Sequence, residues 1–398
     1  MPKVLVLDST YDNIAEAVEQ VFETFPIDLK DKKVCIKVNC VAPMSHEEFA
    51  FVTDPRLIKA VVAKVESLGP KELVIGDSVG TLSFGKTDET FEATYHKEAA
   101  GKYYKNFSKN VMLTEIERPR KRTMAVLRDV MEADVYISLP KLKPHWLTRI
   151  TAAVKNNYGV FVGLQKAWFH YVAVTEEEFT YGMIQSYALR PPDLVIGDAV
   201  IVQHGYSPAT NEQTHSNKLL ASTDGVALDA VFCEMIGYQQ EDVPTMTIAR
   251  EQGLGETDLA KIEVIGSLAL PEQWHLPAKP VCSFEYNWEL NGTTGRGYDL
   301  ERFRDRVAAR PMIDTALCAA CEACADEALC VKNCPVGALS GSRGEIVCAK
   351  DQCLVCTSCM EWCPARGINM LPPDPEILEA LKQNEDAHRK QLAPLRLI

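Results

Sequence analysis

The sequence lacks several features that mark familiar classes of protein. Its net charge of −13 leaves no excess of basic residues for non-specific contact with a nucleic-acid backbone. No apolar run reaches the roughly 20 residues that a bilayer-spanning helix needs, so we expect no membrane span. No Gly-x-Gly-x-x-Gly follows a strand-like segment, because Gly76-Asp77-Ser78-Val79-Gly80 is spaced differently. Nicotinamide and flavin therefore find little support, although a flavin bound without that motif remains compatible with the sequence.

An export leader is also missing, since Met1-Pro2-Lys3 runs directly into the strand-like Val4-Leu5-Val6-Leu7. We therefore expect a cytoplasmic protein whose fourteen cysteines are not used for disulfides. The hydrophobic content of 46% and charged content of 24% are typical of a soluble globular protein. A length of 398 residues predicts two or three structural units.

Eight of the cysteines form two C-terminal motifs that each end in Cys-Pro. The second motif is Cys353-x2-Cys356-x2-Cys359-x3-Cys363-Pro364, a spacing that binds a 4Fe-4S cluster. The first has the same form, with a loop inserted before its third ligand, when it is written Cys318-x2-Cys321-x8-Cys330-x3-Cys334. In two-cluster proteins the last cysteine of each motif ligates the other cluster. We therefore predict two 4Fe-4S clusters, one held by Cys318, Cys321, Cys330 and Cys363, the other by Cys353, Cys356, Cys359 and Cys334.

Two further cysteines complicate this assignment. Cys324 competes with Cys330 as the third ligand of the first motif, and Cys330 is favoured because it preserves the Cys-x3-Cys-Pro ending. Cys348 has no assigned role. Structural zinc needs two pairs of ligands, which the packed triplets and Cys-Pro endings do not suit. The sequence over about residues 312–371, with its exit Cys334-Pro335-Val336-Gly337-Ala338-Leu339, resembles the two-cluster bacterial ferredoxins, which implies a small α+β iron–sulfur domain and a redox partner protein.

The first 270 residues alternate short β-branched runs with amphipathic stretches, which predicts an α/β body with a mixed or parallel sheet. We expect helices over Asp54–Ser67 and Val226–Ile236. Residues 271–311 are expected to form a closing segment or linker, 312–371 the cluster domain and 372–398 a helical tail. The expected strands are Lys3–Leu7, Lys33–Val38, Glu72–Ile75, Val135–Ser138, Leu194–Ile196 and Ile262–Ile265.

A cationic segment follows the Val135–Ser138 strand. Lys141 and Lys143 share one side of an extended chain, because side chains alternate with period two. If a helix begins near His145, then Thr148, Ala152 and Lys155 share one of its faces. Together with Lys37, Asn39 and Asn156, these residues predict a cradle for a small carboxylate or phosphate, with His145 or Lys155 as the proton donor.

The placement of Lys37 supports this site, because a central parallel strand is normally apolar on both faces and a buried ammonium needs a partner. A structural ion pair between Lys37 and Asp229 is the rival interpretation. Asp77 and Asp198 are further candidate binding residues, since two similar segments end in Gly76-Asp77 and Gly197-Asp198. Ligands bind at such strand ends in parallel sheets. The aspartates could equally cap the turns that follow.

The large domain resembles the family called domain of unknown function 362, which often carries a C-terminal ferredoxin unit. A more remote similarity to lactate racemase implies a two-lobed body with a cleft. The residues that carry the family resemblance are Ile36-Lys37-Val38-Asn39, Thr53-Asp54-Pro55, Ile75-Gly76-Asp77-Ser78, Leu139 to His145, Val154 to Gly159, Lys166 to His170, Asp198 and Thr223 to Asp229.

Three functions fit these observations. The first is an iron–sulfur oxidoreductase that passes single electrons to a small anionic substrate or second cofactor. The second is an electron carrier whose large domain docks partners. The third is a non-redox acid–base enzyme with structural clusters. The sequence does not decide between a monomer and a homodimer.

Overall fold

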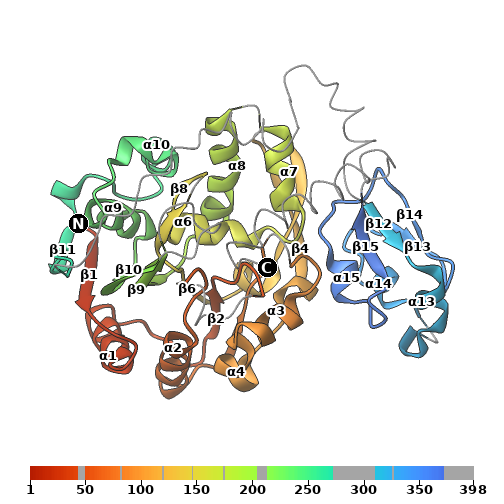
Figure 1. The fold of residues 1–398 in the computed structure, drawn as a ribbon, viewed down its shortest axis with the longest axis horizontal. Helices are drawn as coiled ribbons and strands as arrows, with labels where there is room; N and C mark the ends of the chain where they lie inside the picture. The colour runs from red at the N-terminus through yellow and green to blue at the C-terminus, as the bar shows by residue number, and fades with distance from the viewer. Residues whose placement is uncertain are drawn as a thin grey trace.

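The computed structural model describes residues 1–43, 50–80, 83–118, 121–145, 147–173, 175–203, 213–271, 310–324 and 327–371. Within these residues the chain forms a large α/β body and a smaller C-terminal lobe (Figure 1). We call the lobe, residues 310–371, the cysteine unit. Most of the expected linker and the whole expected helical tail lie outside the described residues, except that 310–311 begin a strand of the cysteine unit.

The described part of the body is built on a mixed seven-stranded sheet with the order β11-β1-β10-β9-β6-β2-β3. β10 runs antiparallel to both of its neighbours, and every other neighbouring pair is parallel. The strands are β1 (Lys3–Asp8), β2 (Lys33–Val38), β3 (Glu72–Gly76), β6 (Val135–Leu139), β9 (Leu194–Gln203), β10 (Gln213–Ser222) and β11 (Glu263–Gly266).

Helices cover both faces of this sheet, so its central strands, such as β6 and β9, are buried on both sides. On one face, α1 (Ile14–Thr24) and α2 (Pro55–Ser67) pack against residues such as Ile36 and Ile137. The opposite face carries two apolar clusters. The helices on that side are α6 (Ala153–Asn156), α7 (Gln165–Val172), α8 (Glu176–Leu189), α9 (Gly225–Met235) and α10 (Pro244–Glu251).

Local sequence explains where the two expected helices begin. The Asp54 carboxylate accepts a hydrogen bond from the Arg56 backbone N–H at the start of α2, and Pro55 occupies the first turn, where its missing N–H is harmless. Asp224 caps α9 in the same way through the N–H groups of Val226 and Ala227.

One prediction about local structure was wrong. No helix begins near His145; instead β7 (Lys143–His145) and β8 (Arg149–Thr151) form a short antiparallel hairpin, and α6 starts later. Arg149 has a φ of +66°, a left-handed conformation that does not continue a helix.

The other helices and strands belong partly to the body and partly to the cysteine unit. In the body they are α3 (Thr87–Ala93), α4 (His96–Ala100), α5 (Arg128–Met131) and the hairpin of β4 (Val111–Ile116) and β5 (Arg122–Leu127). In the cysteine unit the elements are β12 (Arg310–Ile313), α13 (Thr315–Ala320), α14 (Leu329–Lys332), β13 (Leu339–Ser340), β14 (Val347–Cys348), α15 (Ser358–Glu361) and β15 (Ile368–Leu371). There β12 pairs with β15, and β13 pairs with β14.

Candidate functional site: a lysine pocket and two cysteine cavities

Four lysines lie near the carboxyl ends of β2 and β6, and we call this group of residues the lysine pocket: Lys37, Lys141, Lys143 and Lys155. β2 continues through α2 to β3 on one side, whereas β6 leads to β9 on the other, so the chain leaves these neighbouring strands in opposite directions. In open α/β sheets ligands bind outside the carboxyl ends of the strands at such a switch point. The fold therefore brings Lys37, at the end of β2, to the place where a ligand is expected.

Lys37 is fully buried and fully paired there. Its ammonium lies 2.8 Å from the Asp77 carboxylate and also donates to Val38 O and to Asn156 Oδ1. The other Asp77 oxygen accepts from the Cys40 backbone N–H at 2.9 Å. Burial raises the pKa of Asp77, while Lys37 opposes that rise. The Lys37 partner is therefore Asp77.

The rival pair of Lys37 with Asp229 was wrong. Asp229 instead accepts the backbone N–H groups of Ala153 and Val154 at 2.7 and 3.0 Å, which caps α6. Burial raises the pKa of Asp229 to about 7. Asp229 thus fixes the short helix that carries Lys155 and Asn156.

A second buried ion pair follows β6. The Lys141 ammonium lies 3.0 Å from Asp198, whose carboxylate also accepts from the Tyr11 hydroxyl and the Asp54 N–H. Burial and the Asp198 carboxylate raise the pKa of Tyr11 well above its usual value. Asp77 and Asp198 therefore have the same role, because each neutralises a buried lysine at the end of a neighbouring strand.

Two other lysines lack a carboxylate partner among the described residues. Lys143 donates to the Phe51 carbonyl and lies over the Phe51 ring. Burial lowers the pKa of Lys143 well below its usual value, and Lys155 and Lys141 lower it further. Lys155 is half-buried, makes no hydrogen bond or ion pair to any described residue, and has its pKa lowered to about 8 by burial and by Lys37. Neither Lys143 nor Lys155 is therefore paired with a carboxylate among the described residues.

Asn39 and His145 lie at the edges of this region. The Asn39 N–H donates to Thr53 Oγ1, and Asn39 O accepts from the Thr53 N–H. The side-chain Oδ1 of Asn39 is buried without a hydrogen-bond partner among the described residues. His145 is half-buried, and its Nδ1 accepts the N–H groups of Leu147 and Thr148. The Nδ1 atom of His145 therefore accepts hydrogen bonds within the turn between β7 and β8.

The sequence reasoning missed Lys166 and Gly159 as site residues. Lys166 donates to Ser78 O, Ser78 Oγ and Val79 O, and burial lowers its pKa to about 7. A Cβ added at Gly159 would lie 2.7 Å from the Lys37 ammonium, so only glycine fits beside the Lys37–Asp77 pair. Lys166 lies in a matched family segment, but its spacing along the chain gives no sign that it reaches Ser78.

The cysteine unit contains two cavities within its described residues, with similar empty volumes of about 350 and 340 Å³ that include open solvent. Four cysteines line the larger one: Cys334, Cys353, Cys356 and Cys359. Five cysteines line the other: Cys318, Cys321, Cys324, Cys330 and Cys363. We call these the Cys356 cavity and the Cys321 cavity.

The sulfur atoms in these cavities are free thiols. Backbone N–H groups of Ala338 and Gly344 donate to the sulfurs of Cys334 and Cys318, each at 3.2 Å. Burial raises the pKa of Cys330 to about 11. No group of three or more His, Cys, Asp or Glu among the described residues is arranged to hold a metal ion.

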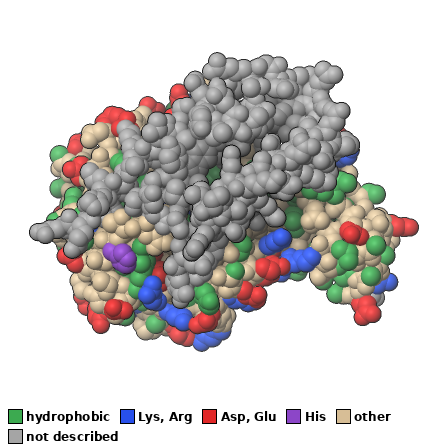
Figure 2. Space-filling model, viewed as in Figure 1, with side chains coloured by type: hydrophobic (Ala, Val, Ile, Leu, Met, Phe, Trp, Pro, Cys, Tyr) green, Lys and Arg blue, Asp and Glu red, His purple; other side chains and the backbone are tan. Residues whose placement is uncertain are grey.

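The chain carries a net charge of −13. Figure 2 shows Asp and Glu side chains distributed around the edge of the described surface. None of the described helices is long and apolar enough to cross a bilayer.

Known proteins are similar to parts of this chain. A thylakoid-associated protein of Synechocystis sp. is 32% identical over 156 residues, which are 38% of this chain and 48% of that protein. The chain thus spans about half the length of this curated relative.

Two solved structures are also similar. The lactate racemase apoprotein of Thermoanaerobacterium thermosaccharolyticum has a TM-score of 0.38 and 11% identity, over 59% of this chain and 56% of its own. A Thermotoga maritima protein has a TM-score of 0.39 and 13% identity, over 57% of this chain and 58% of its own. Neither similarity is close enough to bear on the chemistry of this chain.

The family described as domain of unknown function (DUF362) matches residues 34–234, just over half of the 398 residues. The protein belongs to this family.

Proposed function

We propose that the protein is an iron–sulfur oxidoreductase with two 4Fe-4S clusters in a ferredoxin-like C-terminal domain and a small anionic substrate in the lysine pocket. The observation that carries the proposal is the way the cysteines divide between the two cavities. Cys334, from the first motif, lines the Cys356 cavity, whereas Cys363, from the second motif, lines the Cys321 cavity. This exchange of the last cysteines is the arrangement expected for two-cluster proteins.

The chemistry of the donor set fits such clusters. Each cavity presents at least four thiols from segments with cluster-binding spacing, and N–H groups point at two of the sulfurs. Hydrogen bonds to sulfur are one means by which proteins tune cluster potentials. When bound, the clusters would supply electrons one at a time. Cys324 and Cys330 both line the Cys321 cavity, so both remain candidates for its third ligand.

The lysine pocket supplies the binding and the proton. The Lys155 ammonium would neutralise a carboxylate or phosphate, and Lys143 would donate a hydrogen bond to it, because neither lysine has a carboxylate partner among the described residues. A hydrogen bond to a charged group typically contributes about 1.5–3 kcal/mol. With a pKa of about 8, Lys155 is protonated at neutral pH and can give up its proton to a reduced product. Lys37, Lys141, Asp77 and Asp198 would hold the frame, and Asn39, Asn156 and His145 would line it.

The experiment that tests this proposal begins with anaerobic purification and assay of iron and acid-labile sulfide. We expect about eight of each per chain, and about half the iron in Cys334→Ser and in Cys363→Ser. Cys233→Ala is the matched control, since Cys233 is buried in α9 and should leave the iron content unchanged. Zinc in place of iron, or no iron, would contradict the proposal at its first step.

The second stage asks what the reduced protein reduces. Dithionite-reduced protein is mixed with single carboxylates and phosphates, and the visible absorbance of the clusters is followed. Reoxidation that needs a small anion, and that Lys155→Met abolishes, would support the reductase and begin to identify its substrate. Anion-dependent reoxidation that survives Lys155→Met would place the substrate elsewhere.

A carrier in the cytoplasm is the second candidate, and the acidic surface favours it, because acidic electron carriers can dock basic redox partners. Full clusters that reoxidise only with another redox protein would establish this function instead of the reductase.

A further inference from the structure

Residues 354–366 of the cysteine unit make hydrogen bonds and an ion pair to described residues of the body. Leu354 O accepts from Arg122 at 3.1 Å, Ser358 Oγ donates to Ser108 O at 3.1 Å, and the Trp362 indole donates to Lys109 O at 3.3 Å. This segment includes α15 and ends at Arg366, which pairs with Glu89 and donates to Gly85 O. The contact surface thus belongs to the second cysteine motif.

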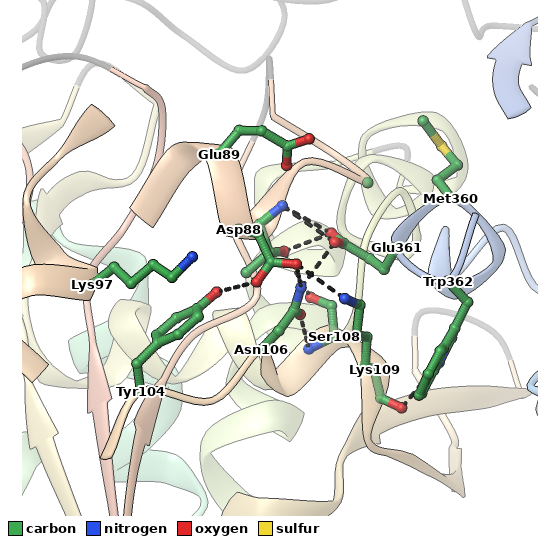
Figure 3. A network of polar contacts seen from close by, with 12 residues as sticks. Asp88, Glu89, Lys97, Tyr104, Asn106, Ser108, Lys109, Met360, Glu361 and Trp362 are labelled. Carbon is green, nitrogen blue, oxygen red and sulfur yellow. Dashed lines mark hydrogen bonds and ion pairs between the residues drawn. The ribbon is translucent and has the colours of Figure 1, made fainter. Parts of the chain in front are cut away.

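Glu361 lies at the centre of this surface (Figure 3). Its side chain is 3% exposed and accepts from the Thr87 N–H at 3.0 Å, the Thr87 hydroxyl at 2.6 Å and the Asn106 amide at 3.0 Å. These donors come from the body, at the start of α3 and before Phe107. A buried carboxyl whose hydrogen-bond donors all belong to the facing domain is well placed to fix how the two domains dock.

The charged groups around Glu361 are organised on the body side. Asp88 accepts from Tyr104, Asn106 and Lys109. Asn106 therefore links the Asp88 network to Glu361, as Figure 3 shows. The receiving surface has its own hydrogen bonds in addition to those it makes with the cysteine unit.

In the docked position the Cys356 backbone lies against Gly163 of the body. A Cβ added at Gly163 would lie 2.3 Å from Cys356 O and 2.2 Å from Thr357 Oγ1, and Gly163 has a φ of +63°. The Gly163 N–H donates to Ser78 Oγ, and Ser78 directly follows Asp77, the partner of Lys37. The Cys356 backbone and the pocket are therefore connected through a single packed loop.

The Cys321 cavity is lined by one cysteine of the docked segment, Cys363, and by four cysteines of the first motif. No hydrogen bond or ion pair from the described residues of its first-motif segment, Cys318 to Cys334, reaches the body. In Figure 1, α13 lies on the side of the lobe away from the body. The two cavities thus differ in their surroundings.

We propose that Glu361 is a positioning residue that docks the cysteine unit so that the Cys356 cavity is the inner site, facing the lysine pocket, and the Cys321 cavity the outer one. The assignment of inner and outer roles rests on the proposed function, whereas the docking itself does not. The docking role predicts that loss of the Glu361 contacts separates the cysteine unit from the body, while both cavities keep their proposed clusters.

The first test is hydrogen–deuterium exchange on the anaerobically purified full chain. In Glu361→Ala we expect exchange to rise at least tenfold in peptides covering residues 83–110 and 354–366, while peptides covering 313–324 stay unchanged. Glu361→Gln, which keeps one acceptor oxygen, should restore most of the protection. Glu345→Ala is the matched control, because Glu345 is exposed on the same unit. A rise that also includes residues 313–324, with loss of iron, would mean that Glu361 only stabilises the unit, and would overturn the docking role.

Gly163→Ala tests the same surface from the body side, since its Cβ would collide with Cys356 O and Thr357. It should raise exchange over residues 354–366 while leaving Glu361 in place. Unchanged exchange in both Gly163→Ala and Glu361→Ala would overturn the proposal.

The second test is a redox titration followed by electron paramagnetic resonance. Undocking admits water to the inner site, so one midpoint potential should shift in Glu361→Ala and the other should stay as in the wild type. Equal shifts, or none, would contradict the distinction between inner and outer sites. If the protein holds no iron, the proposed function fails, but the exchange experiment still reports on the docking.

Discussion

Lys155→Met should make the protein more stable at neutral pH and weaken binding of the proposed anion. Lys155 has no protein partner among the described residues, and burial lowers its pKa from 10.5 to about 8. Because one pKa unit corresponds to about 1.4 kcal/mol, holding this ammonium in place costs the folded state up to about 3 kcal/mol. Methionine has a similar length and no charge, so it should recover part of that free energy. The loss of a charged hydrogen bond should weaken anion binding by about 10- to 150-fold.

The pH dependence identifies the origin of the effect. Below pH 8 the folded and unfolded states both hold the Lys155 proton, and the penalty is fully present. Between about pH 8 and 10.5 the folded state loses the proton that the unfolded state keeps, so stability from this group rises with pH. The advantage of Lys155→Met should therefore be present at pH 7 and vanish near pH 10.5.

Thermal unfolding of anaerobic samples at pH 7 and pH 10 measures this directly. The control is Lys30→Met, which replaces an exposed lysine and should change stability by less than about 0.5 kcal/mol. A Lys155→Met protein that is less stable than wild type at pH 7 would refute the reasoning, because it would show that the ammonium has a stabilising partner.

Three further predictions address the frame of the pocket and the cavities. Lys37→Met should lower the free energy of unfolding by about 3–5 kcal/mol, because it leaves the buried Asp77 charge unpaired. Chemical denaturation measures this change, and a decrease below about 1 kcal/mol would contradict a stabilising ion pair. Asp229 has a folded pKa of about 7 against about 3.9 when unfolded, so its contribution to stability should fall as pH rises from about 4 to 7, by up to about 1.4 kcal/mol per pH unit. Asp229→Asn should remove that slope, and an unchanged pH profile would contradict it. Iron assays of Cys324→Ser and Cys330→Ser should show a loss in only one variant, which identifies the third ligand; equal losses would mean that both thiols contribute.

Much of the fold could be predicted from local sequence. Every strand expected in the body forms, and all except β9 lie within one residue of their predicted bounds, because β-branched runs such as Val34-Cys35-Ile36 are buried on both faces of the sheet. The largest extension is in β9, which continues to Gln203 beyond the predicted Ile196. There β9 pairs with the antiparallel β10, a long-range contact that the local pattern does not contain.

The candidate site could be predicted only in part. That Lys37 needs a partner follows from its place in an apolar strand, but the choice of Asp77 over Asp229 depends on which strand lies next to β2. The hairpin at Lys143–Thr151 was missed because its pairing depends on Arg149 adopting a left-handed conformation, which its side chain does not favour.

The repeated Gly-Asp ending has a common physical explanation in the structure. Gly76-Asp77 and Gly197-Asp198 each place a carboxylate beside a lysine from the neighbouring strand or its extension, Lys37 in one case and Lys141 in the other. Each pair is buried and neutral overall, so neither leaves charge for a ligand. Lys143 and Lys155 have no carboxylate partner among the described residues; besides burial, Lys155 lowers the pKa of Lys143, and Lys37 lowers the pKa of Lys155. Lys37 and Lys141, with their carboxylate partners, would therefore form the frame of the proposed site. A ligand would bind there by supplying the negative charge that Lys143 and Lys155 receive from no described carboxylate.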